Sequence, residues 1–175
     1  MQRGYTLIGL LIAMALLATL ASLAAPSFSD LRQTAVLDAQ RQHVMDALWY
    51  TRSEAVSRRV RVTMQARESG WSDGWKIFID HNQNGHHDPS ESLLQQRAAL
   101  PEGFQLLANR GIGHAVSYRS DGRSTQPDGG LQMGTFTLCR LTANTGNIMR
   151  QAIVMSATGR VRIKEDVDQT DDGSC

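Results

Sequence analysis

The sequence contains little that points to catalysis. It has two cysteines, Cys139 and Cys175, and neither lies in a CxxC or another metal-ligand spacing. It lacks the GxSxG, HExxH, P-loop and glycine-rich dinucleotide motifs that position a nucleophile, a zinc ion or a phosphate. We therefore do not expect an enzyme. The net charge of +1 also excludes a strong overall attraction to nucleic acid or anionic lipid.

Charge is missing altogether from residues 4–29, between Arg3 and Asp30. An uncharged apolar run of this length can cross the hydrocarbon core of a bilayer as a helix. A secretory signal peptide is the alternative, because Leu20 to Ala25 resembles its small-residue exit, but such a peptide usually has a more basic leader and a shorter apolar core. The 175 residues otherwise suffice for one apolar anchor and one modest domain.

Proline and glycine are absent between Pro26 and Gly70, so nothing interrupts a helix there. Apolar residues recur at steps of seven, four and seven, which places them on one helical face. They are Leu37, Val44, Leu48 and Ala55. The pattern predicts one helix from about Tyr5 to Arg58, with a kink or a lost hydrogen bond at Pro26. Its second part, residues 30–59, is amphipathic and packs on a domain.

Residues 60–175 read as a β-rich domain, because short runs of Val, Ile, Phe and Thr alternate with Gly, Asn, Asp and Pro. The candidate strands are Val60–Met64, Trp75–Ile79, Ser92–Gln96, Phe104–Leu107, Val116–Arg119, Phe136–Arg140, Ala152–Ser156 and Val161–Lys164. Turn signals lie at Ser72-Asp73-Gly74, Asp121-Gly122 and Asp128-Gly129-Gly130. A helix followed only by strands predicts an α+β domain with a sheet packed on the helix.

The two cysteines are a candidate disulfide. A domain exported across an inner membrane meets an oxidising compartment, where Cys139 and Cys175 can pair. The alternative is two unrelated free thiols.

Several segments together resemble the GspH/FimT family of type IV minor pilins and type II secretion pseudopilins. The first is the short leader ending in Gly4, followed by Tyr5-Thr6-Leu7-Ile8, which resembles a prepilin-peptidase site. The others are Pro26 and the segments Arg52-Ser53-Glu54-Ala55-Val56, Gly74-Trp75-Lys76-Ile77-Phe78-Ile79-Asp80, Gly134-Thr135-Phe136-Thr137-Leu138-Cys139 and Thr158-Gly159-Arg160-Val161-Arg162.

The resemblance implies a pilin-like fold, with a long N-terminal helix packed on a C-terminal antiparallel β-sheet domain. It implies a leader of residues 1–4, cleavage after Gly4, methylation of Tyr5 and an assembly helix over residues 5–29 that spans the membrane. The chain is then a single-pass protein of the inner membrane with a periplasmic domain, and joins a fibre after assembly. The implied partners are other minor pilins or pseudopilins, the prepilin peptidase, the inner membrane and DNA.

Gly9 departs from the family pattern, which has Glu five residues into the mature chain. In the family that carboxylate is thought to neutralise the terminal amine of a neighbouring subunit, and an unpaired charge within a bilayer is costly. Gly9 cannot make this pairing. The departure indicates a subunit that needs no acceptor above it, as at a fibre tip; the alternative is drift at a dispensable position.

The segment from Asp80 to Glu91 has the spacing of an EF-hand calcium loop. The ligand set is Asp80, Asn82, Asn84, Asp88 and Glu91, with the backbone of His86, and Gly85 would supply the sharp turn. The alternative is a hairpin turn, because the segment before it reads as a strand and not as a helix. His86 and His87 are also a candidate metal pair, but adjacent side chains of an extended segment point apart. Two solvated histidines are the alternative there.

Gly159-Arg160-Val161-Arg162 is a candidate site for a polyanion. On a strand, Arg160 and Arg162 project on the same face and Lys164 continues it, so the three cations could follow a phosphate backbone. The resemblance implies DNA capture for natural transformation at such a motif. The alternative is a solvated strand face, and the acidic residues from Glu165 to Asp172 would oppose a polyanion.

Three functions remain open from the sequence. The first is an assembly protein that initiates or caps a fibre, and the second is a DNA receptor on a competence pilus. The third, a single-pass membrane protein unrelated to pili, requires the family matches to be accidental.

Overall fold

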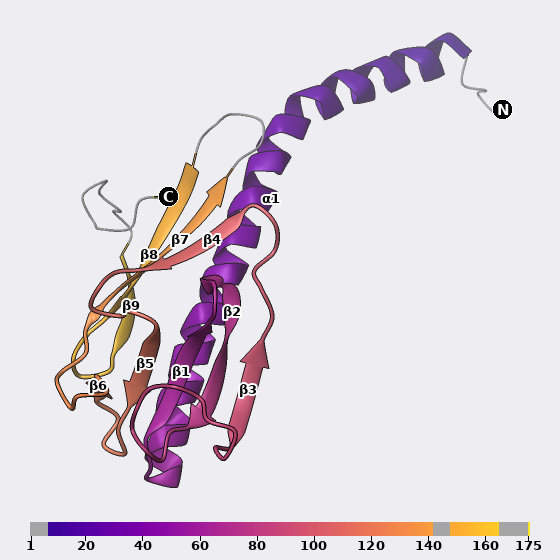
Figure 1. Cartoon of the computed structure of the whole chain (residues 1–175). Helices are drawn as coiled ribbons and strands as arrows, with labels where there is room; N and C mark the ends of the chain where they lie inside the picture. The colour runs from indigo at the N-terminus through magenta and orange to yellow at the C-terminus, as the bar shows by residue number, and fades with distance from the viewer. Residues whose placement is uncertain (1–6, 142–147, 165–174) are drawn as a thin grey trace. The chain divides into compact units, whose positions relative to one another are not determined.

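The computed structural model describes residues 7–141, 148–164 and 175, and it contains one helix and nine strands in those ranges (Figure 1). The helix α1 is Leu7–Arg58, and the strands are β1 Val62–Arg67, β2 Gly70–Ile79, β3 Leu93–Arg97, β4 Phe104–Ala108, β5 Ala115–Tyr118, β6 Ser124–Thr125, β7 Gly134–Leu141, β8 Ile148–Met155 and β9 Val161–Lys164. A long helix followed only by strands is the predicted class. The α+β fold is therefore confirmed.

The chain divides into two compact units, Met1–Ala39 and Gln40–Cys175. In the first unit the described side chains from Leu7 to Leu20 are all exposed. No helix in the described ranges combines the length and the apolar character that a membrane crossing demands. The helix assignment continues through Pro26.

In the second unit, α1 buries one stripe of side chains. Val44, Leu48 and Ala55 have no exposed surface. Leu37, which belongs to the first unit, is buried as well. The same face includes Thr51, whose hydroxyl donates to the carbonyl of Ala47 at 2.6 Å, so no polar group of this side chain is left unpaired in the core. The apolar spacing read from the sequence thus identifies the packing face of the helix.

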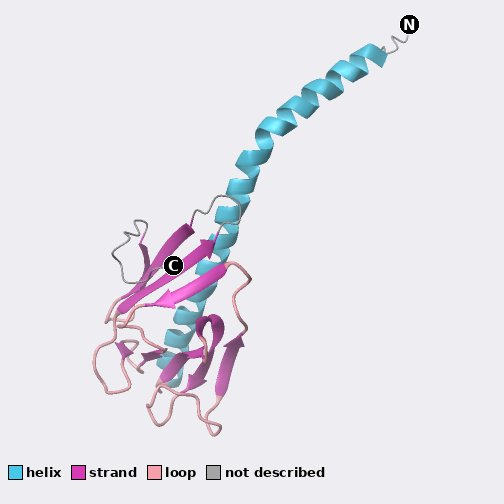
Figure 2. Cartoon of the chain, turned by 45° about the horizontal axis from the view of Figure 1, so that its top comes forward, coloured by secondary structure: helices cyan, strands magenta, loops and turns pink. Residues whose placement is uncertain are grey.

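The strands form two antiparallel sheets (Figure 2). One has five strands in the order β3-β2-β1-β5-β6, and the other has four in the order β4-β7-β8-β9. In the first sheet Met64 pairs with Ile77 on one side and with Val116 on the other, and all three are fully buried. Figure 1 shows β1 and β2 alongside the C-terminal part of α1.

The beginning of β2 joins the two sheets. The rings of Trp71 and Phe136, from different sheets, meet edge to face with centroids 4.9 Å apart, and the Trp71 indole donates to the carbonyl of Gly113 at 2.8 Å. The Ser72 hydroxyl accepts a hydrogen bond from the amide of Leu106 at 3.0 Å. An aromatic pair of this geometry adds about 0.5–1.5 kcal/mol to its area burial. These contacts hold the two sheets together through one corner.

Three details of the predicted domain are wrong. The expected single sheet is two sheets, and β6, with only Ser124 and Thr125, carries too weak a pattern to be seen in the sequence. The predicted turn at Ser72-Asp73-Gly74 lies inside β2. There Gly74 has φ +96°, and a Cβ would meet the carbonyl oxygen of Arg97 at 2.3 Å, so this glycine marks a close strand approach and not a turn.

The start of the first strand also differs from the prediction. Arg59 has φ +57°, the left-handed conformation that commonly follows the last residue of a helix. It reverses the chain after Arg58, and β1 begins at Val62 in place of Val60.

The disulfide between Cys139 and Cys175 is present, as predicted. Cys139 is fully buried in β7, and the bond joins residues 36 positions apart. The guanidinium of Arg150 donates to the carbonyl of Cys175 at 3.1 Å. The last residue of the chain is therefore fixed to the four-stranded sheet by a covalent bond and a hydrogen bond.

The buried stripe of α1 predicts the effect of truncating it. The Leu48→Ala variant should lose about 2–5 kcal/mol of unfolding free energy, because it leaves a cavity at a fully buried position. Leu31→Ala makes the same truncation on the same helix at a side chain that is 68% exposed, and should change stability by less than about 0.5 kcal/mol. Denaturant unfolding of the full chain in non-ionic detergent, followed by the fluorescence of buried Trp71 and Trp75, measures both. Equal losses in the two variants would contradict this packing.

Removal of the disulfide should lower stability by about 3–4 kcal/mol, the loop-entropy value for a closed loop of this size. The comparison uses wild type and the Cys139→Ser/Cys175→Ser variant in the same unfolding assay. Dithiothreitol should lower the wild-type midpoint and leave that of the variant unchanged. A wild-type midpoint that does not respond to reductant would show that the bond makes no such contribution.

Candidate functional site

The end of α1 meets two turns of the β domain. Arg52 donates from Nη2 to the carbonyl of Thr158, 3.3 Å away, in the turn between β8 and β9. A Cβ on Gly122, in the turn between β5 and β6, would lie 3.1 Å from Nε of the same arginine. Arg52 and Thr158 belong to two of the segments that carry the family resemblance. The structure therefore brings these segments together.

The turn between β8 and β9 requires glycine at position 159. It has φ +76°, and a Cβ there would come within 2.3 Å of the Gly122 carbonyl oxygen and 2.9 Å of the Tyr118 ring. The Tyr118 ring is fully buried, and its hydroxyl lies 3.5 Å from the sulfur of Met155. Burial raises the pKa of Tyr118 well above its ordinary value. The turn between β8 and β9 thus packs on this buried ring and on the turn between β5 and β6.

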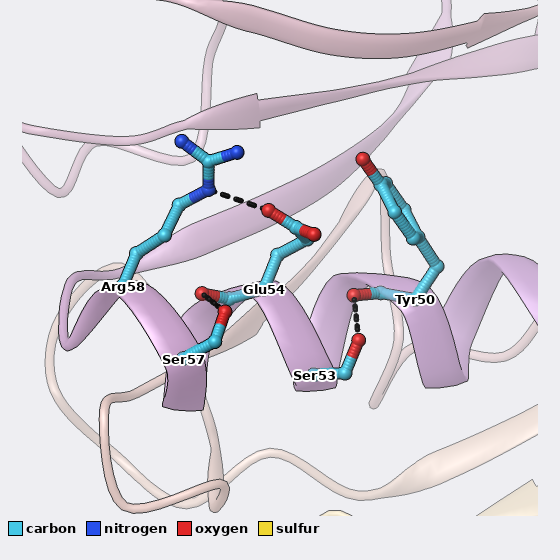
Figure 3. Close-up of polar contacts among 5 residues, drawn as sticks. All are labelled: Tyr50, Ser53, Glu54, Ser57 and Arg58. Atoms are coloured by element: carbon cyan, nitrogen blue, oxygen red, sulfur yellow. Dashed lines mark hydrogen bonds and ion pairs between the residues drawn. The ribbon is translucent and has the colours of Figure 1, made fainter.

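Polar side chains order the last turns of α1 (Figure 3). Arg58 forms an ion pair with Glu54 one turn earlier, and this hydrogen bond raises the pKa of Arg58. The hydroxyls of Ser53 and Ser57 each donate to the backbone carbonyl three residues before them, Tyr50 and Glu54, at 3.1 and 3.2 Å. Figure 3 shows Tyr50, Glu54 and Arg58 on the same side of the helix. A cation in the last turn also favours the helix dipole.

The predicted basic strand is only partly as expected. Arg162 lies in β9, but Arg160 is in the turn before it, where its carbonyl accepts the amide of Ser156 at 3.0 Å. Both arginines are exposed, whereas Lys164 is half-buried. Strand β9 is an edge strand, paired within the described residues only to β8. The three cations therefore do not form one uniform face, although two of them are accessible beside a sheet edge.

The loop from Asp80 to Glu91 joins two strands, β2 and β3, and lacks the helices that flank an EF-hand. Its two buried carboxylates bind protein donors. Asp80 Oδ2 accepts from the Thr63 hydroxyl at 2.8 Å and the Gly85 amide at 3.1 Å. Glu91 accepts from the amides of His81 and Asp88 at 2.9 and 3.1 Å. These bonds close the loop on itself.

The other proposed calcium ligands lie on the outside of this loop. The amide groups of Asn82 and Asn84 both donate to Oδ2 of Asp88, at 2.6 and 3.1 Å, and His86 is exposed. Across residues 7–141, 148–164 and 175, no three His, Cys, Asp or Glu side chains are grouped so that they could hold a metal ion. Calcium binding stays a prediction.

The two adjacent histidines point to different surroundings. His86 Nδ1 lies 3.0 Å from the side-chain nitrogen of Gln65. His87 meets the Phe78 ring edge to face at 5.1 Å, and its Nε2 is buried without a hydrogen-bond partner in the described residues. They do not form a metal pair within that part of the chain. The alternative prediction of two solvated histidines is wrong for His87, because its ring packs against buried Phe78.

Sequence reasoning missed one grouping, a hollow of about 540 Å³ at the end of the five-stranded sheet. Its lining includes Arg59, Arg61, Asp80, Arg119, Ser120 and Thr125, and we call it the arginine hollow. Val62 pairs with both Ile79 and Tyr118. Arg61 precedes Val62, while Asp80 and Arg119 follow Ile79 and Tyr118, so all three lie at the same end of the antiparallel sheet. The sequence shows the arginines of residues 52–61 as a basic stretch, but only strand register adds Arg119 to them.

Two predicted features concern the N-terminus. Gly4 and Tyr5 lie outside the described residues. Gly9 lies in α1, where it presents no side chain.

Comparison with known proteins gives consistent results. The family model described as type II transport protein GspH matches residues 40–159, and the prokaryotic N-terminal methylation motif matches residues 1–25. The pilin-like protein PilA1 of Thermus thermophilus is 33% identical over 92 residues, which are 53% of this chain and 57% of that protein. The match thus spans little more than half of that relative.

Solved structures give the same fold. Two crystal structures of the type IV minor pilin FimU from Pseudomonas aeruginosa superpose with TM-scores of 0.56 and 0.53 at 19% identity. They cover 75% and 73% of this chain, and 90% and 91% of the FimU chains. At this identity the likeness concerns the fold alone. With the match to the GspH model over residues 40–159, the chain belongs to the GspH family and has the type IV pilin fold.

Proposed function

We propose that the protein is a minor pilin or pseudopilin that takes part in assembly of a type IV pilus or a type II secretion pseudopilus, at initiation or at the tip. One observation carries this proposal: the same chain has an N-terminal methylation motif at residues 1–25 and, after it, a match to the GspH family model at residues 40–159. Such a chain is processed and methylated at its N-terminus and then packs its helix against those of other subunits. The partners are other minor pilins or pseudopilins and the prepilin peptidase.

The first unit supports this role through its surface. Leu10, Leu16 and Leu17 are each 60–66% exposed, and their described neighbours from Leu7 to Leu20 are exposed as well. A continuous apolar surface of this kind marks a site of protein or membrane contact. We propose that the inner membrane covers it before assembly, with the β domain in the periplasm, and that neighbouring helices cover it in the fibre.

Gly9 supports a place at the start or tip of the fibre. An acidic side chain at this position would need the amine of another subunit, since an unpaired charge in an apolar setting is costly. Gly9 needs no such partner. The subunit is therefore suited to a position with no subunit docked above it.

DNA binding for natural transformation is the second candidate function. Arg160 and Arg162 are exposed in and before the edge strand β9, and neither forms an ion pair with a described residue. Exposed arginines two residues apart could contact successive phosphates of a nucleic-acid backbone. Lys164 is half-buried and contributes less.

The assembly proposal predicts the N-terminus of the mature chain. In wild type, the chain recovered from sheared fibres should begin at Tyr5 and carry one methyl group on its amine, as measured by mass spectrometry. Gly4→Val should keep Met1 and stay in the membrane fraction, because a side chain replaces the glycine at the cleavage site. Gly9→Ala, which leaves the leader intact, should still be cut before Tyr5. A wild-type chain with Met1 intact, or one cut near Ala25, is incompatible with the proposal.

The DNA-binding proposal predicts a salt-dependent gel shift with the full chain in non-ionic detergent. The Arg160→Ala/Arg162→Ala variant should bind duplex DNA more weakly and lower the slope of log affinity against log salt by about two, one for each lost phosphate contact. Arg67→Ala/Arg110→Ala removes two exposed arginines elsewhere and should bind as wild type does. Equal binding by wild type and the Arg160→Ala/Arg162→Ala variant would contradict the proposal that this motif captures DNA.

A further inference from the structure

The arginine hollow has a net positive charge among its described lining residues, since three arginines face the one carboxylate of Asp80. Arg119 approaches Asp121 at 4.0 Å, but both side chains are about half exposed, and such a pair contributes little. Within the described ranges, no carboxylate forms an ion pair with Arg59 or Arg61. Arg61 donates to the neutral carbonyl of Gln83 at 3.2 Å. Burial lowers the pKa of Arg61, the nearby carboxylate of Asp80 raises it, and the neighbouring charge of Arg119 lowers it. An anion would reduce the repulsion between these two arginines.

Asp80 is the one carboxylate among the described lining residues, and it is only half satisfied. Its Oδ2 accepts two hydrogen bonds, from Thr63 and Gly85. Its Oδ1 is buried and has no hydrogen-bond partner in the described part of the chain. The side chain as a whole is 1% exposed. A buried acceptor without a donor is costly, so a ligand that donates a hydrogen bond to Oδ1 is favoured here.

These two observations restrict the chemistry of a ligand. The arginines favour an oxyanion, since guanidinium groups match its oxygens in geometry and charge. Asp80 repels an oxyanion that has no proton to donate. A phosphoryl group with a second titration near pH 6 keeps a hydroxyl on part of its population at neutral pH. Sulfate and phosphodiesters carry no such hydroxyl. The hydroxyls of Ser120 and Thr125, which also line the hollow, add partners for the remaining oxygens.

We propose that the arginine hollow binds a protonated phosphoryl group, as inorganic phosphate or as a phosphomonoester. Arg61 and Arg119 hold the anionic oxygens, and Asp80 Oδ1 accepts the phosphoryl hydroxyl. A volume of about 540 Å³ leaves room for the organic part of a small ester. The site is distinct from Arg160 and Arg162, and does not depend on fibre assembly or on DNA binding.

Isothermal titration of the full chain in non-ionic detergent tests this proposal. The probes are sodium phosphate, glycerol phosphate, sodium sulfate and dimethyl phosphate. Phosphate or glycerol phosphate should bind at least about tenfold more tightly than sulfate and dimethyl phosphate, because only the first two can donate to the buried carboxylate. Tighter binding of glycerol phosphate identifies an ester as the ligand class, and tighter binding of inorganic phosphate identifies the free ion.

Single variants locate the binding. Arg61→Gln and Arg119→Gln should each weaken phosphate binding about tenfold or more, since each removes a charge-assisted hydrogen bond. Arg110→Gln alters an exposed arginine outside the hollow and should bind phosphate as wild type does. No binding at millimolar phosphate, or unchanged binding in both hollow variants, would overturn the proposal.

Asp80→Asn tests the selectivity. The amide donates where the carboxylate only accepts, so the preference for phosphate over sulfate should fall towards one. Circular dichroism checks that the variant folds, because Asp80 also anchors the loop through Thr63 and Gly85. If it does not fold, the wild-type comparison decides the same point. Equal affinity of wild type for phosphate and sulfate would overturn the assignment of a protonated ligand.

Discussion

Burial of one stripe of α1 is the constraint on which the β domain depends. Val44, Leu48 and Ala55 have no exposed surface, and the hydroxyl of Thr51 on the same face is bonded within the helix. The sheets pack on this apolar face. At the end of the helix, Arg52 contacts the turns that contain Gly122 and Gly159. The helix thus supplies part of the core, beside the buried side chains of the two sheets.

Buried side chains hold the loops of the domain, because they form hydrogen bonds with backbone groups that have no backbone partner there. Gln132 is 3% exposed and donates to the carbonyls of Ile112 and Ala115 while it accepts the amide of Ser117. Asp80 and Glu91 do the same at the two ends of the loop between β2 and β3. The spacing of oxygen side chains that resembles a calcium loop therefore has a structural use without any ion, because the same oxygens accept amide hydrogens of the loop.

The sequence predicted what depends on local pattern and missed what depends on register. The stripe from Leu37 to Ala55 follows helical spacing, and the disulfide of Cys139 follows from the two cysteines and the oxidising compartment that the sequence leads us to expect. The division into two sheets was not predictable, since antiparallel runs carry no mark of which sheet they join. The arginine hollow was missed for the same reason: Arg61 and Arg119 are far apart in sequence and become neighbours only because Val62 pairs with Tyr118.

The two groups of arginines differ in a way that bears on what each can bind. Arg160 and Arg162 are exposed at a sheet edge, where salt screens charge and a long flexible polyanion gains most from several weak contacts. Arg61 is half-buried beside a buried carboxylate, where screening is weaker and each hydrogen bond is more specific. The exposed pair therefore suits contact with a nucleic-acid backbone that does not depend on base sequence. The hollow suits a small ligand that is selected by the proton it can donate. A single domain can carry both, because they rely on different strands and on different degrees of burial.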